Sequence, residues 1–188
     1  MEKRILGAVL GLALAISGAV RAETTAEAGQ WKNAVSINLP SLAVGLMSAQ
    51  YEMRLTPGSS LPVRLYYVSV GGDESSFTGL GAGAAYRMYF GQKALEGFYF
   101  APTFDALMLT LKVTEAVTKL EAKATGTLFG PGVELGKQWI WNSGFLIDFG
   151  LNGTYYIGNV EAKAGNQSAK VSFAGFVPGL RLAIGLAF

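Results

Sequence analysis

Large apolar residues recur at every second position along most of this sequence, and this alternation constrains the fold more than any other feature. In residues 46–55, Met47, Tyr51 and Met53 share one side of an extended chain, whereas Glu52 and Arg54 share the other. Successive side chains of a β-strand point to opposite faces of a sheet. The alternation therefore predicts strands with one apolar and one polar face, because an amphipathic helix would repeat its apolar residues every three or four positions.

The same alternation recurs in eight segments, each bounded by a turn or a polar loop. We predict strands at residues 32–39, 46–55, 61–70, 78–90, 97–111, 125–138, 145–158 and 171–188. An even number of strands of about ten residues that alternate in polarity is typical of a membrane barrel. Because lipid cannot hydrogen-bond to unpaired backbone groups, a sheet within a bilayer has to close on itself. The sequence thus predicts an all-β chain, folded as an eight-stranded antiparallel up-and-down transmembrane β-barrel.

The first 22 residues have the layout of a secretory signal peptide. Lys3 and Arg4 precede an apolar run over residues 5–20, and the segment ends at Ala22, where cleavage is expected. A retained N-terminal anchor is the alternative, although the run is shorter than the roughly 18 residues of a spanning helix. We expect residues 1–22 to be removed and residues 23–188 to form a single barrel domain.

Composition supports a chain that meets lipid. Hydrophobic residues make up 51% of the sequence and charged residues 15%, whereas about 25% is usual for charged residues in soluble domains. The net charge of +2 is too small to indicate a nucleic-acid partner, and the absence of cysteine excludes disulfides and thiol chemistry. A soluble barrel of the lipocalin type is an alternative, but it would have to bury the face that carries the bulky Phe, Tyr and Met side chains.

The links between the predicted strands alternate in character. If the N-terminus is periplasmic, the turns at residues 56–60, 91–97 and 138–144 are on the inner side. The outer connections at residues 71–76, 113–124 and 158–170 include two that are long and charged. Short periplasmic turns and longer external loops are expected of such barrels. The first outer connection, residues 40–45, is short and apolar, which indicates a tight loop at the membrane rim.

Aromatic residues gather beside the inner turns. Trp139 and Trp141 adjoin the third turn, and Phe90, Phe98 and Tyr99 adjoin the second. Aromatic side chains form girdles at the membrane–water interface of barrels. We therefore predict that these five side chains belong to a girdle at the periplasmic side.

The outer connection at residues 113–124 permits two interpretations. Val113, Val117 and Leu120 have helical spacing, and Glu115 with Lys119 forms a helix-type pair. A short helix that caps the barrel and a protruding extension of the strands both fit this segment. Loops on a rigid scaffold often carry binding sites, so a surface ligand could be contacted here.

The chain resembles the small eight-stranded outer-membrane barrels of Gram-negative bacteria, such as OmpX and the membrane domain of OmpA. The resemblance covers residues 33–188, and its most specific local match is the C-terminal insertion signal. Arg181, Ala183, Leu186 and Phe188 occupy the polar, glycine, apolar and terminal aromatic positions of that signal, with alanine in place of glycine. The resemblance implies a location in the outer membrane, contact with outer-membrane lipid, and recognition by the barrel-assembly machinery during insertion.

Eight charged residues fall on the predicted inward face of the strands. They are Glu52, Asp105, Glu134 and Asp148, together with Arg54, Arg64, Arg87 and Arg181. Charges buried in a narrow barrel should be paired, and arginine suits forked pairing with carboxylates. An eight-stranded barrel is just wide enough to hold its own side chains. We therefore predict a lumen filled by an ion-pair network of these eight residues.

Catalysis lacks its usual groups in this sequence. There is no histidine to act as a base for a serine nucleophile, and no G-x-S-x-G motif is present. Asp73 and Glu74 lack the further spaced carboxylates of a calcium loop. We expect no enzyme, cofactor or metal site, and a structural or surface-interaction role instead.

A narrow, porin-like pore for small solutes or ions is the alternative function. Six inward glycines leave little side-chain volume in two strands: Gly79, Gly81, Gly83, Gly130, Gly132 and Gly136. Either water fills the space above them, or large side chains from other strands lie across them.

Overall fold

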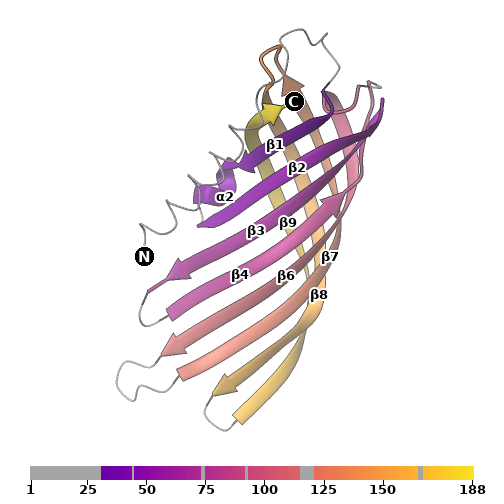
Figure 1. Ribbon diagram of the computed structural model, residues 1–188. Helices are drawn as coiled ribbons and strands as arrows, with labels where there is room; N and C mark the ends of the chain where they lie inside the picture. The colour runs from indigo at the N-terminus through magenta and orange to yellow at the C-terminus, as the bar shows by residue number, and fades with distance from the viewer. Residues whose placement is uncertain (1–30, 44, 73–74, 92, 115–120, 165–166) are drawn as a thin grey trace.

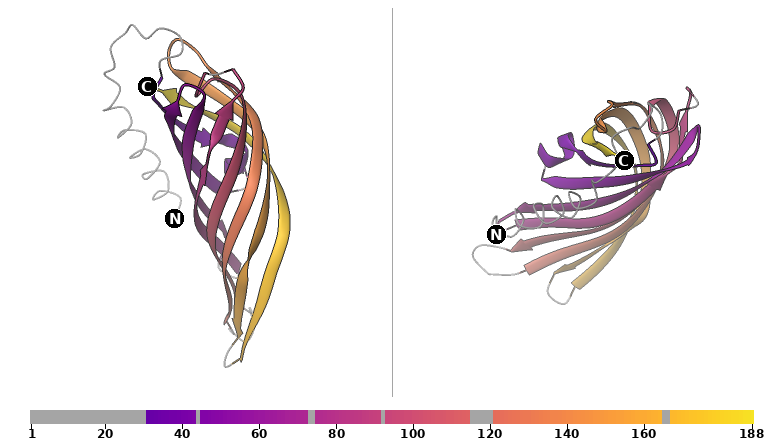
Figure 2. Two further views of the ribbon diagram at one scale, coloured as in Figure 1. Left: turned by 90° about the vertical axis from the view of Figure 1, so that its right-hand side faces the viewer. Right: turned by 45° about the horizontal axis from the view of Figure 1, so that its top comes forward.

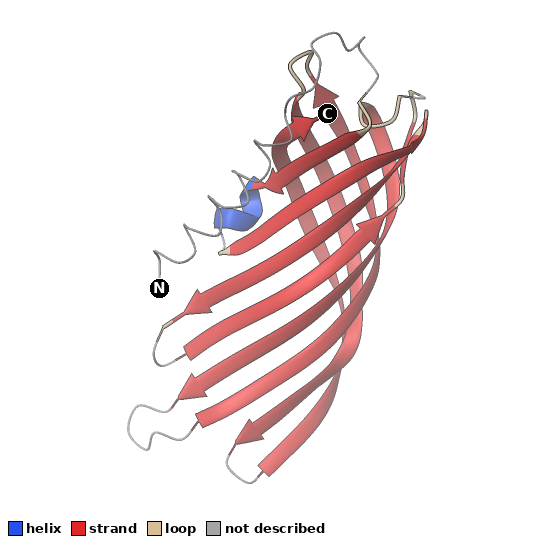
Figure 3. Cartoon of the chain, in the orientation of Figure 1, coloured by secondary structure: helices blue, strands red, loops and turns tan. Residues whose placement is uncertain are grey.

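The computed structural model describes residues 31–43, 45–72, 75–91, 93–114, 121–164 and 167–188. This part of the chain contains one short helix and nine strands (Figure 1, Figure 3). They are β1 (Asn33–Asn38), α2 (Leu39–Ala43), β2 (Leu46–Thr56), β3 (Ser59–Gly71), β4 (Ser75–Ala85), β5 (Arg87–Tyr89), β6 (Gly97–Thr114), β7 (Glu121–Ile140), β8 (Phe145–Ala164) and β9 (Gln167–Ala187). None of the described helices is long and apolar enough to cross a membrane. The expected signal peptide, residues 1–22, lies outside the described residues.

The strands form a closed ring in which every neighbouring pair is antiparallel. Strands β4 and β5 are two parts of one strand, interrupted at Tyr86, because both pair with β3 on one side and β6 on the other. Strand β1 pairs with β2 and also with β9, which joins the two ends of the sheet. The ring therefore has eight strands in up-and-down order, and the predicted all-β, antiparallel up-and-down barrel is confirmed (Figure 2).

The two faces of the sheet separate as the alternation predicts. Along β9, Leu182, Ile184 and Leu186 point outward and are 37–39% exposed, whereas Arg181 and Ala183 point inward and are 5% and 0% exposed. Phe90 and Phe98 also lie on the outer surface, as expected of girdle residues. Tyr99 does not, because it shares the inward face of β6 with Ala101 and is fully buried. The assignment of Tyr99 to the girdle was therefore wrong.

Strands β6 to β9 are longer than predicted. They contain 18 to 21 residues, against 6 in β1 and 11 in β2. Figure 1 and Figure 2 show them extending past β1 and β2 at the end away from the C-terminus. Of the two interpretations of residues 113–124, the described residues fit the strand extension, since β6 continues to Thr114 and β7 begins at Glu121. Residues 115–120, the middle of the alternative helix, lie outside the described residues.

The first outer connection is helical and not a tight loop. Helix α2 follows β1 directly, and Ser41 Oγ donates a hydrogen bond to the Asn38 carbonyl at 2.7 Å. This turn of helix ends β1 early. The rim of the barrel is therefore lowest at the β1–β2 hairpin.

The faces of the sheet exchange their polarity in the extended part. Leu109, Leu111 and Val113 continue the inward face of β6, which holds Asp105 lower down, while Thr110 and Lys112 continue its outward face. Leu111 and Val113 are 43% and 44% exposed at the open end. The outward face is thus apolar near the chain termini and polar in the extension.

Closure of the ring depends on a close approach at Gly185. A β-carbon there would meet the Val35 carbonyl oxygen and the Ser36 Cα of β1. Gly185→Ala should therefore lower the free energy of unfolding by about 1–3 kcal/mol, because the backbones of β1 and β9 would have to separate. Urea titration of the refolded barrel in detergent measures this effect. Gly72→Ala is the control, since open space surrounds that position, and equal stability of the two variants would contradict the argument.

Candidate functional site

The guanidinium of Arg87 lies at the centre of the lumen, where β5 places it fully buried. Its Nη1 donates to Glu52 Oε2 at 2.9 Å and to Gln138 Oε1 at 2.8 Å. Its Nη2 donates to Glu134 Oε1 at 2.8 Å and to Asp148 Oδ2 at 2.7 Å. One cation thus contacts three carboxylates from three different strands, an arrangement that the fork of arginine allows and the point charge of lysine does not.

Two further arginines flank this centre and complete its charge balance. Arg64 donates from Nη2 to Glu134 Oε2 at 2.7 Å, and Arg181 donates from Nε to Asp148 Oδ2 at 2.6 Å. Three arginines therefore meet three carboxylates, joined by five ion pairs. A buried cluster of this kind is stable only when its charges and hydrogen bonds are matched.

Two tyrosines complete the hydrogen bonding of the carboxylates. The Tyr99 hydroxyl lies 2.9 Å from Glu134 Oε1 and 2.8 Å from Asp148 Oδ1, and the Tyr89 hydroxyl donates to Glu52 Oε1 at 2.7 Å. The guanidinium carbon of Arg87 lies 4.0 Å from the centre of the Tyr99 ring, within cation–π range. Tyr99 therefore contacts the charged centre through both its ring and its hydroxyl.

Every strand of the ring contributes to this network at about the same level. The contributing residues are Ser36 (β1), Glu52 (β2), Arg64 (β3), Arg87 (β5), Tyr99 (β6), Glu134 (β7), Asp148 (β8) and Arg181 (β9). Ser36 joins through its hydroxyl, 3.1 Å from Arg181 Nη2, across the seam where the ring closes. A shift of any strand by one residue would turn its member of the network toward the outside. The network therefore fixes the register of the ring.

Large side chains lie across the inward glycines. A β-carbon on Gly136 would meet the hydroxyl oxygen of Tyr99, and one on Gly130 would meet Thr154 and the ring of Tyr156. Of the two interpretations of these glycines, the structure shows the second, in which side chains from other strands occupy the space. The lumen is filled by protein atoms at this level.

Between the network and the extended end of the barrel, the lumen is lined by apolar side chains. Val68, Leu107 and Leu128 share the inward face, since each lies opposite an inward residue of the neighbouring strand. Val68 and Leu128 are buried. The interior thus changes from a charged layer to an apolar layer toward the extended end.

Six of the eight charged residues predicted for the lumen are joined by the five ion pairs. The other two lie elsewhere: Asp105 is buried and accepts a hydrogen bond from the Tyr66 hydroxyl at 2.9 Å, and Arg54 is partly exposed at the end of β2. The sequence prediction missed six neutral members: Ser36, Gln50, Ser60, Tyr89, Tyr99 and Gln138. All but Ser36 share their alternation with an inward charge, so the signal was present, but neutral side chains were not considered as members of the network.

The carboxylates of the network are buried and paired. Glu52, Glu134 and Asp148 are at most 1% exposed, and each accepts hydrogen bonds from arginine. Within the described ranges, no group of three or more His, Cys, Asp or Glu side chains is placed to hold a metal ion. The geometry is that of a buried ion-pair network.

A family model described as "Protein of unknown function (DUF3575)" matches residues 9–172, which is most of the chain. The chain belongs to the DUF3575 family. The matched region of this DUF3575 protein includes the network residues from Ser36 to Asp148 and ends before Arg181. The resemblance to the OmpX and OmpA barrels therefore holds for the eight-stranded architecture, while the family is DUF3575.

Among solved structures, a crystal structure of CarO2 from Acinetobacter baumannii matches 84% of this DUF3575 chain and 98% of its own chain. The sequence identity is 9% and the TM-score is 0.41. A comparison with curated proteins gives no match.

Removal of Arg87 should destabilise the barrel strongly. Arg87→Ala leaves three carboxylates without their shared cation, and breaking a buried pair costs about 3–5 kcal/mol. Arg87→Lys should be intermediate, because it keeps the charge but loses the fork. Urea denaturation in detergent measures both, with Lys93→Ala as a control for loss of an exposed cation. If Arg87→Ala is as stable as the control, the network does not stabilise the ring.

The Tyr99 hydroxyl should contribute separately from its ring. Tyr99→Phe keeps the contact with the guanidinium but removes a hydrogen bond to a buried carboxylate, which should cost about 1–3 kcal/mol. The matched control is Tyr51→Phe, whose hydroxyl donates to Asn33 on the exposed surface. A larger loss for the control than for Tyr99→Phe in the same urea titration would contradict this assignment.

Proposed function

We propose that this protein is an outer-membrane barrel with a closed lumen and a structural or surface-interaction role. The observation that carries the proposal is a belt of large, exposed apolar side chains on the outward face of every part of the ring. Exposed apolar patches of this extent are rare on soluble proteins and mark contact with lipid or with other proteins. A closed ring meets lipid without leaving any backbone group unpaired.

The height of the belt fits a membrane. Outward residues are predominantly apolar over 80–90 in β4 and β5, 98–108 in β6, 129–139 in β7, 147–157 in β8 and 176–186 in β9. Each stretch covers about eleven residues, the length with which a tilted strand crosses the hydrocarbon core. Toward the extended end, polar outward residues follow these stretches, namely Thr78, Thr110, Thr127, Asn159 and Ser172, as they would where the strands enter water.

Aromatic side chains support the position of the inner boundary. Trp139, Trp141 and Phe145 are exposed around the turn between β7 and β8, and the rings of Trp141 and Phe145 lie 5.5 Å apart. Phe90 and Phe98 are exposed at the same end of the barrel. Such rings favour the interface between lipid and water.

The route to the membrane is part of the proposal. The expected signal peptide would export the chain, and the assembly machinery would read Arg181, Ala183, Leu186 and Phe188. In the folded barrel Arg181 and Ala183 are buried in the lumen, while Leu186 lies on the outward face. Arg181 would therefore act first in recognition and then in the ion-pair network.

The closed lumen favours a plug over a pore. Arg87 and Tyr99 are fully buried at the centre, and the next layer toward the outside is apolar. Ions cross neither a matched charge cluster nor an apolar constriction readily. The glycines that motivated the pore hypothesis are covered by side chains, so no observation in the described part of the chain favours conduction.

Two measurements on one refolded sample of the mature chain test this proposal. A closed barrel should migrate differently on a gel with and without boiling, and should give no steady current in a planar bilayer. A known open porin, reconstituted in the same way, controls for insertion. A steady current from this protein would favour the pore instead, and a chain without a heat-dependent shift would contradict the barrel in the membrane.

A further inference from the structure

The outward face of the extension carries a row of three lysines on adjacent strands. Lys112 lies directly opposite Lys123, and Lys123 lies directly opposite Lys163. Like charges in directly opposed positions of a sheet repel one another. Lys163 contacts Glu161 at 3.0 Å, whereas no described carboxylate contacts Lys112 or Lys123. Because neighbouring strands are about 4.8 Å apart, the row presents three cations within about 10 Å.

The surface between this row and the apolar belt is ordered in the same way on all four strands. Nearest the belt are Ala106, Phe129, Ile157 and Ala174, and the next row is Met108, Thr127, Asn159 and Ser172. The third row is Thr110, Thr125, Glu161 and Lys170, and the lysine row follows with Ser168 beside it. The face thus changes from apolar groups to hydroxyls and amides, and then to cations.

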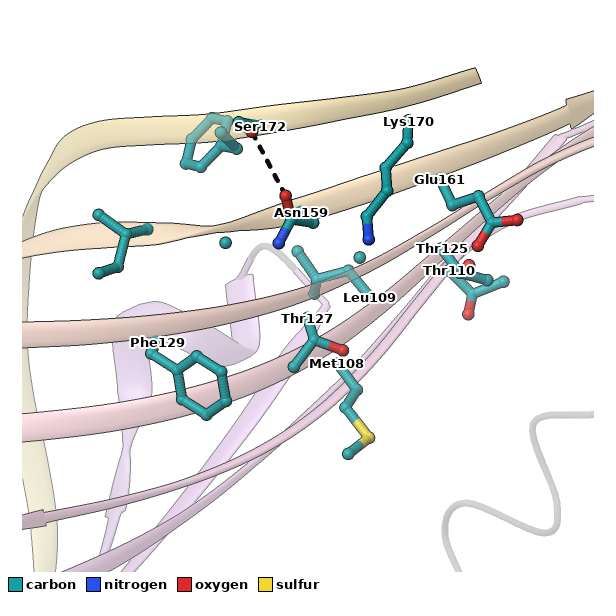
Figure 4. A pocket seen from close by; sticks show the side chains of 14 residues that line it. Met108, Leu109, Thr110, Thr125, Thr127, Phe129, Asn159, Glu161, Lys170 and Ser172 are labelled. Atoms are coloured by element: carbon teal, nitrogen blue, oxygen red, sulfur yellow. Dashed lines mark hydrogen bonds between the residues drawn. The ribbon is translucent and has the colours of Figure 1, made fainter. Parts of the chain in front are cut away.

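A groove lies along these rows. It encloses about 790 Å³, and most of its lining residues are outward members of the first three rows (Figure 4). Figure 4 shows Ser172 bound to Asn159, with Oγ donating to Oδ1 at 3.3 Å, while Thr110, Thr125 and Thr127 lie on the neighbouring strands. The next outward residue after the third row is Lys112 on β6, Lys123 on β7 and Lys163 on β8. The groove therefore leads from the apolar belt toward the lysine row.

We propose that this surface binds the headgroup of a phosphorylated glycolipid in the surrounding leaflet. The acyl chains would lie against Phe129 and Ile157, and the sugar hydroxyls would hydrogen-bond to the Thr, Asn and Ser side chains of the groove. The phosphates would lie between Lys112, Lys123 and Lys163, where an anion relieves the repulsion of the cations. The site rests on the proposed membrane location, and it supplies the ligand class of the surface-interaction role.

Charge complementarity selects this occupant over an uncharged lipid. Two adjacent lysines that contact none of the described carboxylates offer donors to a phosphate, and their position follows the apolar belt by only a few residues along each strand. A soluble anion would use the lysines alone and would gain nothing from the apolar and hydroxyl rows. A phosphorylated glycolipid would contact the lysines, the hydroxyl rows and the apolar row together.

The test compares two double variants with the unaltered mature protein in detergent micelles. Lys112→Gln with Lys123→Gln removes two lysines of the row and leaves the Lys163–Glu161 pair in place. Lys32→Gln with Lys93→Gln removes the same charge from exposed positions at the opposite end of the barrel. The probe is diphosphorylated lipid A, its dephosphorylated form is the comparison, and native mass spectrometry gives the Kd of each.

We expect the unaltered protein and the Lys32/Lys93 variant to bind the diphosphorylated probe equally. The Lys112/Lys123 variant should bind it about thirtyfold more weakly, from the usual contribution of two surface lysines to binding an anionic lipid. The Kd of the unaltered protein should also rise with salt, which needs no variant. Equal Kd values for the three proteins, or equal binding of the dephosphorylated lipid, would overturn the site. Displacement of the lipid by an equal concentration of inorganic phosphate would overturn the lipid as its occupant.

Gel mobility of the same samples separates this inference from the proposed function. If the unaltered protein shows the heat-dependent shift but the lipid Kd is unaffected by the lysines, only the lipid site is wrong. If the unaltered protein shows no shift, the proposed membrane barrel is contradicted, and the lipid site that rests on it is contradicted as well.

Discussion

The guanidinium of Arg87 is the group on which the rest of the ring depends. A cation removed from water in a protein interior costs several kcal/mol unless carboxylates and hydrogen bonds compensate for it. The compensation here comes from β2, β7 and β8, and through Arg64 and Arg181 it reaches β3 and β9. The charges can therefore all pair only when the ring is closed in this register. A barrel with an open seam would leave Arg181 beside Asp148 without Ser36, and a barrel with shifted strands would leave charges on the apolar outward face.

The same alternation of side chains gives the barrel an apolar outward face in one half and a polar outward face in the extension. In the half of the barrel that holds both ends of the described chain, bulky apolar groups point outward and the charged layer fills the inside. In the extension the assignment is reversed, so that Thr110 and Lys112 face outward and Leu109 and Leu111 face inward. No bulge is needed for this exchange, because only the residue types change along a continuous strand. On β6 the outward face changes from apolar to polar between Met108 and Thr110.

The same exchange explains what could be predicted from the sequence. Alternation with large outward groups identified all eight strands, and the parity of the charges identified the six charged residues that pair in the lumen. The strand ends at Thr114 and Glu121 were missed because the apolar signal changes faces there, and Val113 with its neighbours also fits helical spacing. Tyr99 was misplaced because its nearness to a turn was weighed above its parity with Ala101 and Asp105. The contact of Tyr99 with Gly136 depends on the register between β6 and β7, and the contact of Arg87 with Asp148 depends on the distance across the ring. No local sequence pattern contains either.

The residues that stabilise the ring and the residues of the proposed lipid site lie at opposite ends of this molecule. The ion pairs, the tyrosines and the closing seam lie in the half that holds both ends of the described chain, whereas the lysine row lies on strands that extend beyond the rim. Interactions that lie far apart and share no partner contribute almost independently to stability. Substitutions in the extension can therefore change what the surface binds without loosening the plug, while the plug fixes the register on which the alignment of Lys112, Lys123 and Lys163 depends. The charged layer in the lumen thus determines the geometry of the surface that we assign to lipid.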